Sequence, residues 1–199
     1  MSAANDAPAA HSPIAGTQPH AVDRELALLL DHTYDLAAQR RDPTAPLSAL
    51  PPGWQPLDDG QLRAAGIDPT LLVDAKSGFD AALYRNGDGQ VVLAFNGTDQ
   101  GRDWKSNLRQ GIGLQDVQYD QAVALARQAS TAFGNDLVIS GHSLGGGLAA
   151  TAAMVTQAPA VTFNAAGVHD TTLERYGFDA RVLKQEASAG LVRNYQVKN

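Results

Sequence analysis

The chain has 199 residues, enough for one domain or one domain with a tail; 44% of them are hydrophobic and 18% are charged. Fifteen basic and 21 acidic residues give a net charge of −6 without a cluster of Lys and Arg. Nucleic acid is therefore not an expected partner, since binding it needs a basic footprint. The lack of Cys excludes disulfides, cysteine–zinc sites and thiol catalysis, and the five scattered His predict neither a metal nor another cofactor.

Residues 1–20 are rich in Ala, Pro and Ser without periodicity, which predicts a disordered leader ahead of a domain at 21–199. The leader has neither a basic n-region nor an apolar h-region, so we expect cytoplasmic synthesis without a conventional signal peptide. An amphipathic helix is expected from Val22 to about Arg40, because apolar residues recur there at helical spacing, up to Tyr34. Prolines between residues 42 and 60 then predict an irregular connection.

Two strand-like runs, at 79–84 and 90–96, flank an Asn-Gly turn and predict a β-hairpin. A polar loop follows, and then come, in order, a helix (119–133), a buried strand (137–139), a helix (about 144–156), a buried strand (160–164) and a closing strand (191–197). This alternation predicts an α/β fold with a mainly parallel sheet and helices on both faces. The apolar window 148–163 is broken by Gln157 and Pro159, so membrane contact is expected to be at most peripheral.

The sequence Gly141-His-Ser-Leu-Gly145 is a G-x-S-x-G motif between a buried strand and a helix. A sharp strand-to-helix turn strains the backbone of its apex residue and requires almost no side chain two positions before and after it. Ser143 is therefore the expected nucleophile, and the backbone N–H of Leu144, at the helix start, the expected oxyanion donor. A Gly-rich turn that matches the pattern by chance is the alternative.

Four blocks occur in one order: 94–98 with Asp103-Trp104, 138–150, 161–167 and 192–195. Together they resemble the class 3 (fungal-type) lipases, a resemblance that runs from Phe79 onward and implies an α/β-hydrolase fold. It implies that Thr98 is the second oxyanion donor and that residues 100–118 take the place of the family's lid. This segment is polar, which favours a phospholipid or a smaller soluble ester over a triglyceride. Asn96 stands where the family usually has Arg. The ion pair that this Arg makes in the family therefore cannot be assigned to residue 96.

The base and the acid of the serine mechanism are harder to assign. His142 precedes the nucleophile on a strand and would point to the other side, so we expect it to be a supporting residue. In this fold an acid and then a His follow the serine. The resemblance implies that both lie beyond Asn199, so that the domain is C-terminally incomplete. The alternative is Asp170 as a substitute acid, which leaves the base unfilled; His169 as base fails on chain order.

We therefore expect a serine ester hydrolase (lipase, phospholipase or esterase) that acts through an acyl-Ser143 intermediate on an acyl ester or phospholipid. The alternative is a catalytically incomplete hydrolase-fold module that binds an acyl ligand or a partner protein. The leader, the lack of a signal peptide and the polar lid favour a bacterial effector lipase that a specialised system secretes. An inhibitory or immunity protein would be its partner.

Overall fold

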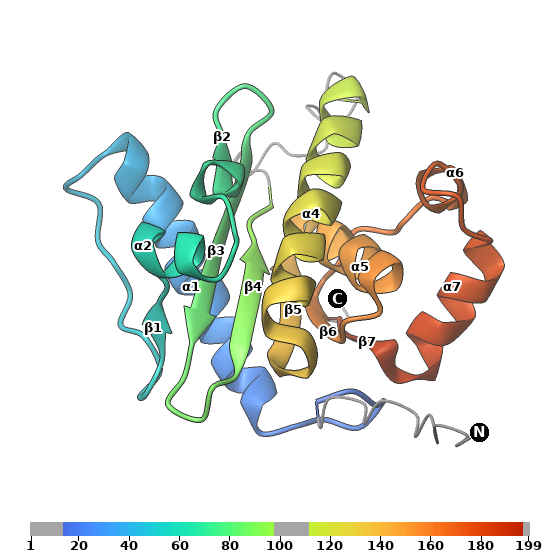
Figure 1. Cartoon of the computed structure of the whole chain (residues 1–199), viewed down its shortest axis with the longest axis horizontal. Helices are drawn as coiled ribbons and strands as arrows, with labels where there is room; N and C mark the ends of the chain where they lie inside the picture. Colours follow the sequence, from blue (N-terminus) through green and yellow to red (C-terminus); the bar gives the residue numbers. More distant parts are fainter. Residues whose placement is uncertain (1–13, 98–111, 197–199) are drawn as a thin grey trace, which may run out of the picture.

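The computed structural model describes residues 14–97 and 112–196. For residues 112–114 it describes the backbone alone. Within the described residues, a mixed sheet has the strand order β1-β3-β4-β5-β6-β7, and β2 pairs with β3 (Figure 1). The strands are β1 (Gln55–Pro56), β2 (Val73–Asp74), β3 (Phe79–Arg85), β4 (Val91–Phe95), β5 (Leu137–His142), β6 (Ala160–Phe163) and β7 (Val192–Tyr195). The α-helices are α1 (Val22–Arg41), α2 (Asp59–Ala64), α4 (Ile112–Phe133), α5 (Leu144–Thr156), α6 (Asp170–Glu174) and α7 (Ala180–Glu186). Short helical turns are η1 (Pro69–Leu72), η2 (Gly134–Asp136) and η3 (Ala187–Leu191).

The hairpin of β3 and β4 is antiparallel, with Leu83 opposite Leu93, as its Asn-Gly turn predicts. From β4 to β7 each strand is parallel to the next, and helices form the crossovers. The predicted α/β fold and the predicted first helix are confirmed. Because the carboxyl ends of parallel strands share one edge of a sheet, the segments after β4, β5 and β6 meet there.

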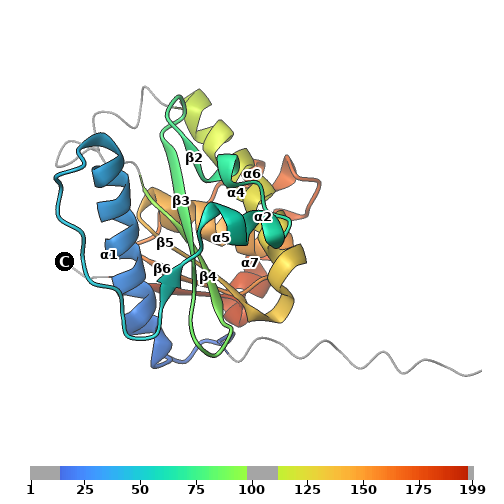
Figure 2. The ribbon, with the colours of Figure 1, turned by 60° about the vertical axis from the view of Figure 1, so that its left-hand side comes forward.

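Both faces of the sheet are covered, and alternate residues of each strand serve the two sides. In β4, Leu93 and Phe95 join the core formed with α4 and α5, while Val92 and Ala94 join the core formed with α1. Figure 2 shows α1 on one side of the sheet, with α4 and α5 on the other. Strands buried on both faces explain why the sequence reads as continuous apolar runs.

A smaller apolar cluster joins α5 to α6 and α7, with Met154, Leu173 and Leu183 buried in it. Figure 1 shows α6 and α7 beyond α5, at the far end of the molecule from β1. No helix within the described residues is both long enough and apolar enough to cross a membrane.

Ile14 and Gly16, which lie within the leader expected at residues 1–20, are attached to the domain. Ile14 is only 3% exposed. The Gly16 N–H donates to the Gly190 carbonyl at 2.8 Å, and the Arg193 guanidinium donates to the Ile14 and Gly16 carbonyls at 2.9 and 2.8 Å. Composition gave no sign of this, because backbone carbonyls and one apolar side chain make the attachment.

The expected lid at 100–118 also needs correction at its end. Residues 112–118 belong to α4, so the helix begins seven residues before the predicted start at Tyr119. Gln118 is buried, and its amide Nε2 donates to the Ser77 carbonyl at 2.6 Å. A polar residue that binds a distant carbonyl can occupy a buried helical position without apolar periodicity. The rest of the expected lid lies outside the described residues.

Candidate active site

The turn from β5 to α5 has the strained backbone that the G-x-S-x-G motif predicts. Ser143 has φ 55° and ψ −122°, a conformation that a non-glycine residue adopts at a cost of about 1–3 kcal/mol. Its side chain is half-buried, at the carboxyl end of β5. Such strain persists only where the surroundings determine the turn completely.

The two glycines of the motif explain how the turn is determined. A Cβ on Gly141 would lie 2.0 Å from the Gly145 carbonyl oxygen, and a Cβ on Gly145 would lie 2.3 Å from the Phe95 carbonyl oxygen. Both distances are far inside van der Waals contact, and both obstacles are main chain. Strand β4, strand β5 and the first turn of α5 can therefore meet only where side chains are absent.

Backbone hydrogen bonds hold the apex from both sides. The Ser143 N–H donates to the Phe163 carbonyl at 3.1 Å, and the Ser143 carbonyl accepts from Ala166 at 2.8 Å and from Gly147 at 3.2 Å. The segment after β6 thus supports the turn from the side opposite β4. These bonds restrict the main chain of Ser143 and so fix the position from which its side chain extends.

Leu144 opens α5, and its backbone N–H is one of the first four in the helix, which have no intrahelical acceptor. The positive end of the helix dipole lies at the same place, so a developing negative charge beside Ser143 would be stabilised. The predicted second donor, Thr98, lies outside the described residues. Gly97, just before it, donates its N–H to the Tyr34 hydroxyl at 2.9 Å.

His142 is the last residue of β5, and its Nδ1 lies 3.3 Å from the Tyr34 hydroxyl. The two rings meet edge to face, with centroids 6.1 Å apart. This contact fits the prediction that His142 is a supporting residue. Tyr34 itself was predicted only as a member of the apolar stripe of the first helix, and no motif marks it.

Asn96 lies at the end of β4 and is buried. Its Nδ2 donates to the Thr33 carbonyl and to Asp80, each at 3.0 Å. Burial raises the pKa of Asp80, against the opposing effect of the ion pair that it makes with Arg40 of α1. The positive charge beside Asp80 thus comes from Arg40, and residue 96 supplies an amide.

The substitute acid considered for the triad, Asp170, is the first residue of α6 and forms an ion pair with Lys184 of α7. Both side chains are exposed. His169 precedes it as the N-cap of α6. The structure therefore gives Asp170 a partner within the α6–α7 region.

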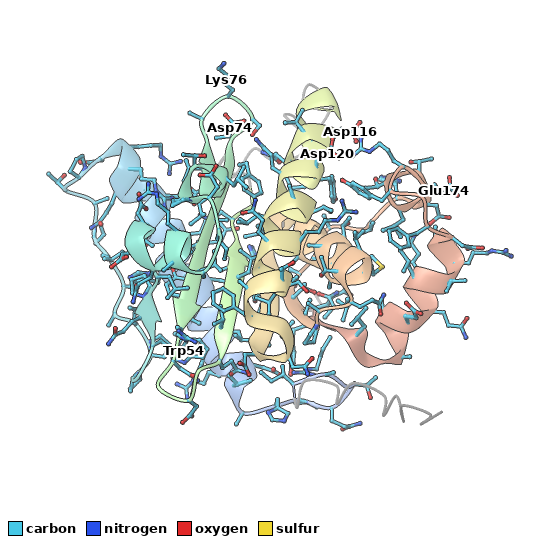
Figure 3. The ribbon with its side chains drawn as sticks, in the orientation of Figure 1. Trp54, Asp74, Lys76, Asp116, Asp120 and Glu174 are labelled. Atoms are coloured by element: carbon cyan, nitrogen blue, oxygen red, sulfur yellow. The ribbon has the colours of Figure 1, made fainter. Side chains whose placement is uncertain are left out.

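Acidic residues of α4 also have a cationic partner. Figure 3 labels Asp116 and Asp120 on α4, with Glu174 at the end of α6. Arg175 lies 2.9 Å from Asp116 and 3.1 Å from Asp120, which ties α6 to α4. No group of three or more His, Asp and Glu among the described residues is arranged to hold a metal ion.

Comparison with known proteins gives two findings. A family model described as a Tle-like phospholipase domain matches residues 25–199. The chain is also 51% identical, over 193 residues, to a protein of Serratia liquefaciens named extracellular phospholipase A1. That alignment covers 97% of this chain and 57% of the relative, so the chain spans little more than half of the relative's length.

Proposed function

The chain belongs to the family of Tle-like phospholipase domains, and from that premise we propose that Ser143 is the nucleophile of an enzyme that hydrolyses an acyl ester of a phospholipid. The observation that carries this proposal is the strained turn at Ser143, because α5 begins at the very next residue, Leu144. A strained serine at a helix start at the carboxyl edge of an α/β sheet is the arrangement that acyl transfer requires. The relative's name supports phospholipase A1 as the activity.

In the proposed reaction, Ser143 Oγ attacks the ester carbonyl carbon while its proton passes to a base. The carbonyl oxygen takes up the negative charge, and the Leu144 N–H stabilises it together with a donor from Thr98. The C–O bond to the glycerol then breaks, and the leaving alkoxide takes the proton from the base. Water hydrolyses the acyl-Ser143 ester by the reverse sequence of proton transfers, which releases the fatty acid.

We take the base and its acid from outside the described residues. The ion pair of Asp170 with Lys184 supports this choice, because it engages the substitute acid elsewhere. The contact of His142 with Tyr34 supports it too, because it gives this imidazole a structural partner on α1.

The relative's name also supports release of the protein from the producing cell. Delivery by a specialised secretion system is the finer proposal. An inhibitory or immunity protein as a partner remains a prediction.

The test is hydrolysis of phosphatidylethanolamine vesicles by the full-length protein and its Ser143→Ala variant. We expect the variant to lose at least about 10³-fold in kcat, since loss of a serine nucleophile removes the covalent pathway. Ser188→Ala, at an exposed serine of η3, is the matched control and should keep full activity. Equal hydrolysis by wild type and Ser143→Ala contradicts the proposal. A folded wild type without activity favours the non-catalytic module instead.

A further inference from the structure

The end of β4 touches the Ser143 turn so closely that the two are one structural unit. A Cβ on Gly97 would lie 3.0 Å from the His142 carbonyl oxygen and 3.5 Å from the Gly145 nitrogen. The parallel register pairs Phe95 with Gly141, so two residues further along Gly97 comes level with Ser143. Any movement of Gly97 therefore changes its distance from Ser143.

One hydroxyl, from a helix on the far side of the sheet, contacts both parts of this unit. Tyr34 accepts the Gly97 N–H at 2.9 Å, and the same oxygen lies 3.3 Å from His142 Nδ1. A Cβ on Gly97 would also lie 2.9 Å from that oxygen, so glycine is required here for the phenol to approach. Tyr34 thus links His142, the residue before Ser143, to Gly97 after the end of β4.

The helix that carries Tyr34 is itself fixed. Its residues Leu26 and Leu29 are fully buried against the sheet. Thr33, next to Tyr34, accepts a hydrogen bond from Asn96, next to Gly97. Successive residues of α1 therefore hold successive residues at the end of β4, and the phenol position is set by a rigid element.

The Gly97 N–H points at Tyr34 and is consumed by this bond. The Gly97 N–H is therefore engaged and does not act as an oxyanion donor.

On the premise of the proposed esterase reaction, we propose that Tyr34 is a positioning residue that holds Gly97 and His142 against the Ser143 turn, and thereby sets the position of the Ser143 hydroxyl and of the Leu144 N–H. Its effect falls on transition-state stabilisation, because donors must lie about 2.7–3.1 Å from the developing oxyanion. Ground-state binding of the acyl chain does not depend on that distance.

The experiment compares wild type with Tyr34→Phe in the full-length protein, with p-nitrophenyl butyrate as a soluble ester. We expect kcat to fall about tenfold while KM changes less than twofold. Affinity for a trifluoromethyl ketone, which forms a tetrahedral adduct with an oxyanion, should fall by the same factor as kcat/KM. Affinity for the matching ether, which forms no oxyanion, should stay within twofold.

Tyr176→Phe is the matched control, since its hydroxyl donates to Asp120 at 2.7 Å on the α4–α6 surface. This variant should leave kcat, KM and the affinities for the ketone and the ether unchanged. An unchanged kcat in Tyr34→Phe, or equal losses of affinity for the ketone and the ether, overturns the inference. If Tyr34→Phe fails to fold, His142→Ala removes the contact between the phenol and the imidazole; kcat should then fall about threefold, and an unchanged kcat overturns the inference.

The proposed function is tested separately by Ser143→Ala on the same ester. If wild type and Ser143→Ala hydrolyse it equally, the proposed function fails. If only Ser143→Ala is inactive and Tyr34→Phe equals wild type, the function stands and the role of Tyr34 falls.

Discussion

The Ser143 turn lies at the start of α5 and the α6–α7 region packs against the same helix, but different interactions hold them in place. The turn is held by backbone hydrogen bonds and by main-chain contacts at Gly141 and Gly145 that leave no room for a methyl group. The α6–α7 region is held by a small apolar cluster and by exposed ion pairs, such as Asp170 with Lys184. Exposed ion pairs contribute about 0–1 kcal/mol each, whereas main-chain overlap cannot relax by rotating a side chain.

A third region contrasts with both, because its ion pair is buried. Asp23 of α1 and Arg193 of β7 are each 6% exposed at the side chain and lie 2.5 Å apart. Tyr195 also donates to Asp23 at 2.6 Å. This pair joins the first helix to the last described strand. Substitutions in the three regions should therefore change the free energy of unfolding by different amounts.

The largest effect is expected for Gly145→Ala in the Ser143 turn. Alanine usually stabilises a helix by about 1 kcal/mol relative to glycine. Here the overlap with the Phe95 carbonyl oxygen, at 2.3 Å, should dominate and lower the free energy of unfolding by more than about 3 kcal/mol. Urea unfolding measures this change, and Gly87→Ala is the control, since a Cβ there meets nothing within 4 Å. A Gly145→Ala protein as stable as wild type would show that the turn is not held by main-chain contact.

The second-largest effect is expected for Asp23→Asn, which leaves the charge of Arg193 buried without its counterion. We expect a loss of about 3 kcal/mol in the free energy of unfolding, also measured in urea. The double variant Asp23→Leu/Arg193→Met should be closer to wild type than either single change, because it removes both charges. Additive losses would contradict this account of the pair.

The same pair predicts a pH dependence. Burial raises the pKa of Asp23, but hydrogen bonds from Arg193, from Tyr195 and from the His20 N–H outweigh it, so the pKa is lowered overall. A carboxyl with a lowered pKa in the folded state stabilises above its unfolded pKa, about 3.9, and loses this contribution as the pH falls through the folded value. The stability gap between wild type and Asp23→Asn should therefore narrow below about pH 4. A constant gap from pH 7 to pH 3 is the opposing result.

The smallest effect is expected for Asp170→Asn in the α6–α7 region. Loss of its exposed ion pair should change the free energy of unfolding by less than about 0.5 kcal/mol. If the triad acid lies elsewhere, hydrolysis of p-nitrophenyl butyrate should stay within about twofold of wild type. Lys184→Gln breaks the same pair and serves as the control. A hundredfold loss of kcat in Asp170→Asn alone would make Asp170 the acid.

The sequence predicted those features that depend on neighbours along the chain. The helix from Val22 follows from helical spacing, the β3–β4 hairpin from its turn, and the strain at Ser143 from two glycines at fixed distances. The contact of Tyr34 with Gly97 joins residues 63 positions apart, and that of Asp23 with Arg193 joins residues 170 apart. No local pattern encodes such contacts, since either partner alone is an ordinary helix or strand residue.

The attachment of Ile14 and Gly16 to the domain could not be predicted, for a related reason. These residues are held through their carbonyls by Arg193, and backbone groups carry no sequence signal. The partner of Asp170 likewise depends on how α6 and α7 pack together. The Ser143 turn was therefore predictable from sequence, while the residues that support it from other elements were not.

Covalent labelling tests whether Ser143 is an activated nucleophile. The full-length protein is treated with a fluorophosphonate, digested, and analysed by mass spectrometry beside its Ser143→Ala variant. We expect one adduct per chain, on the peptide that contains Ser143, and none on that peptide in the variant. A folded, unlabelled wild type, or an adduct that persists in Ser143→Ala at the same rate, would contradict it.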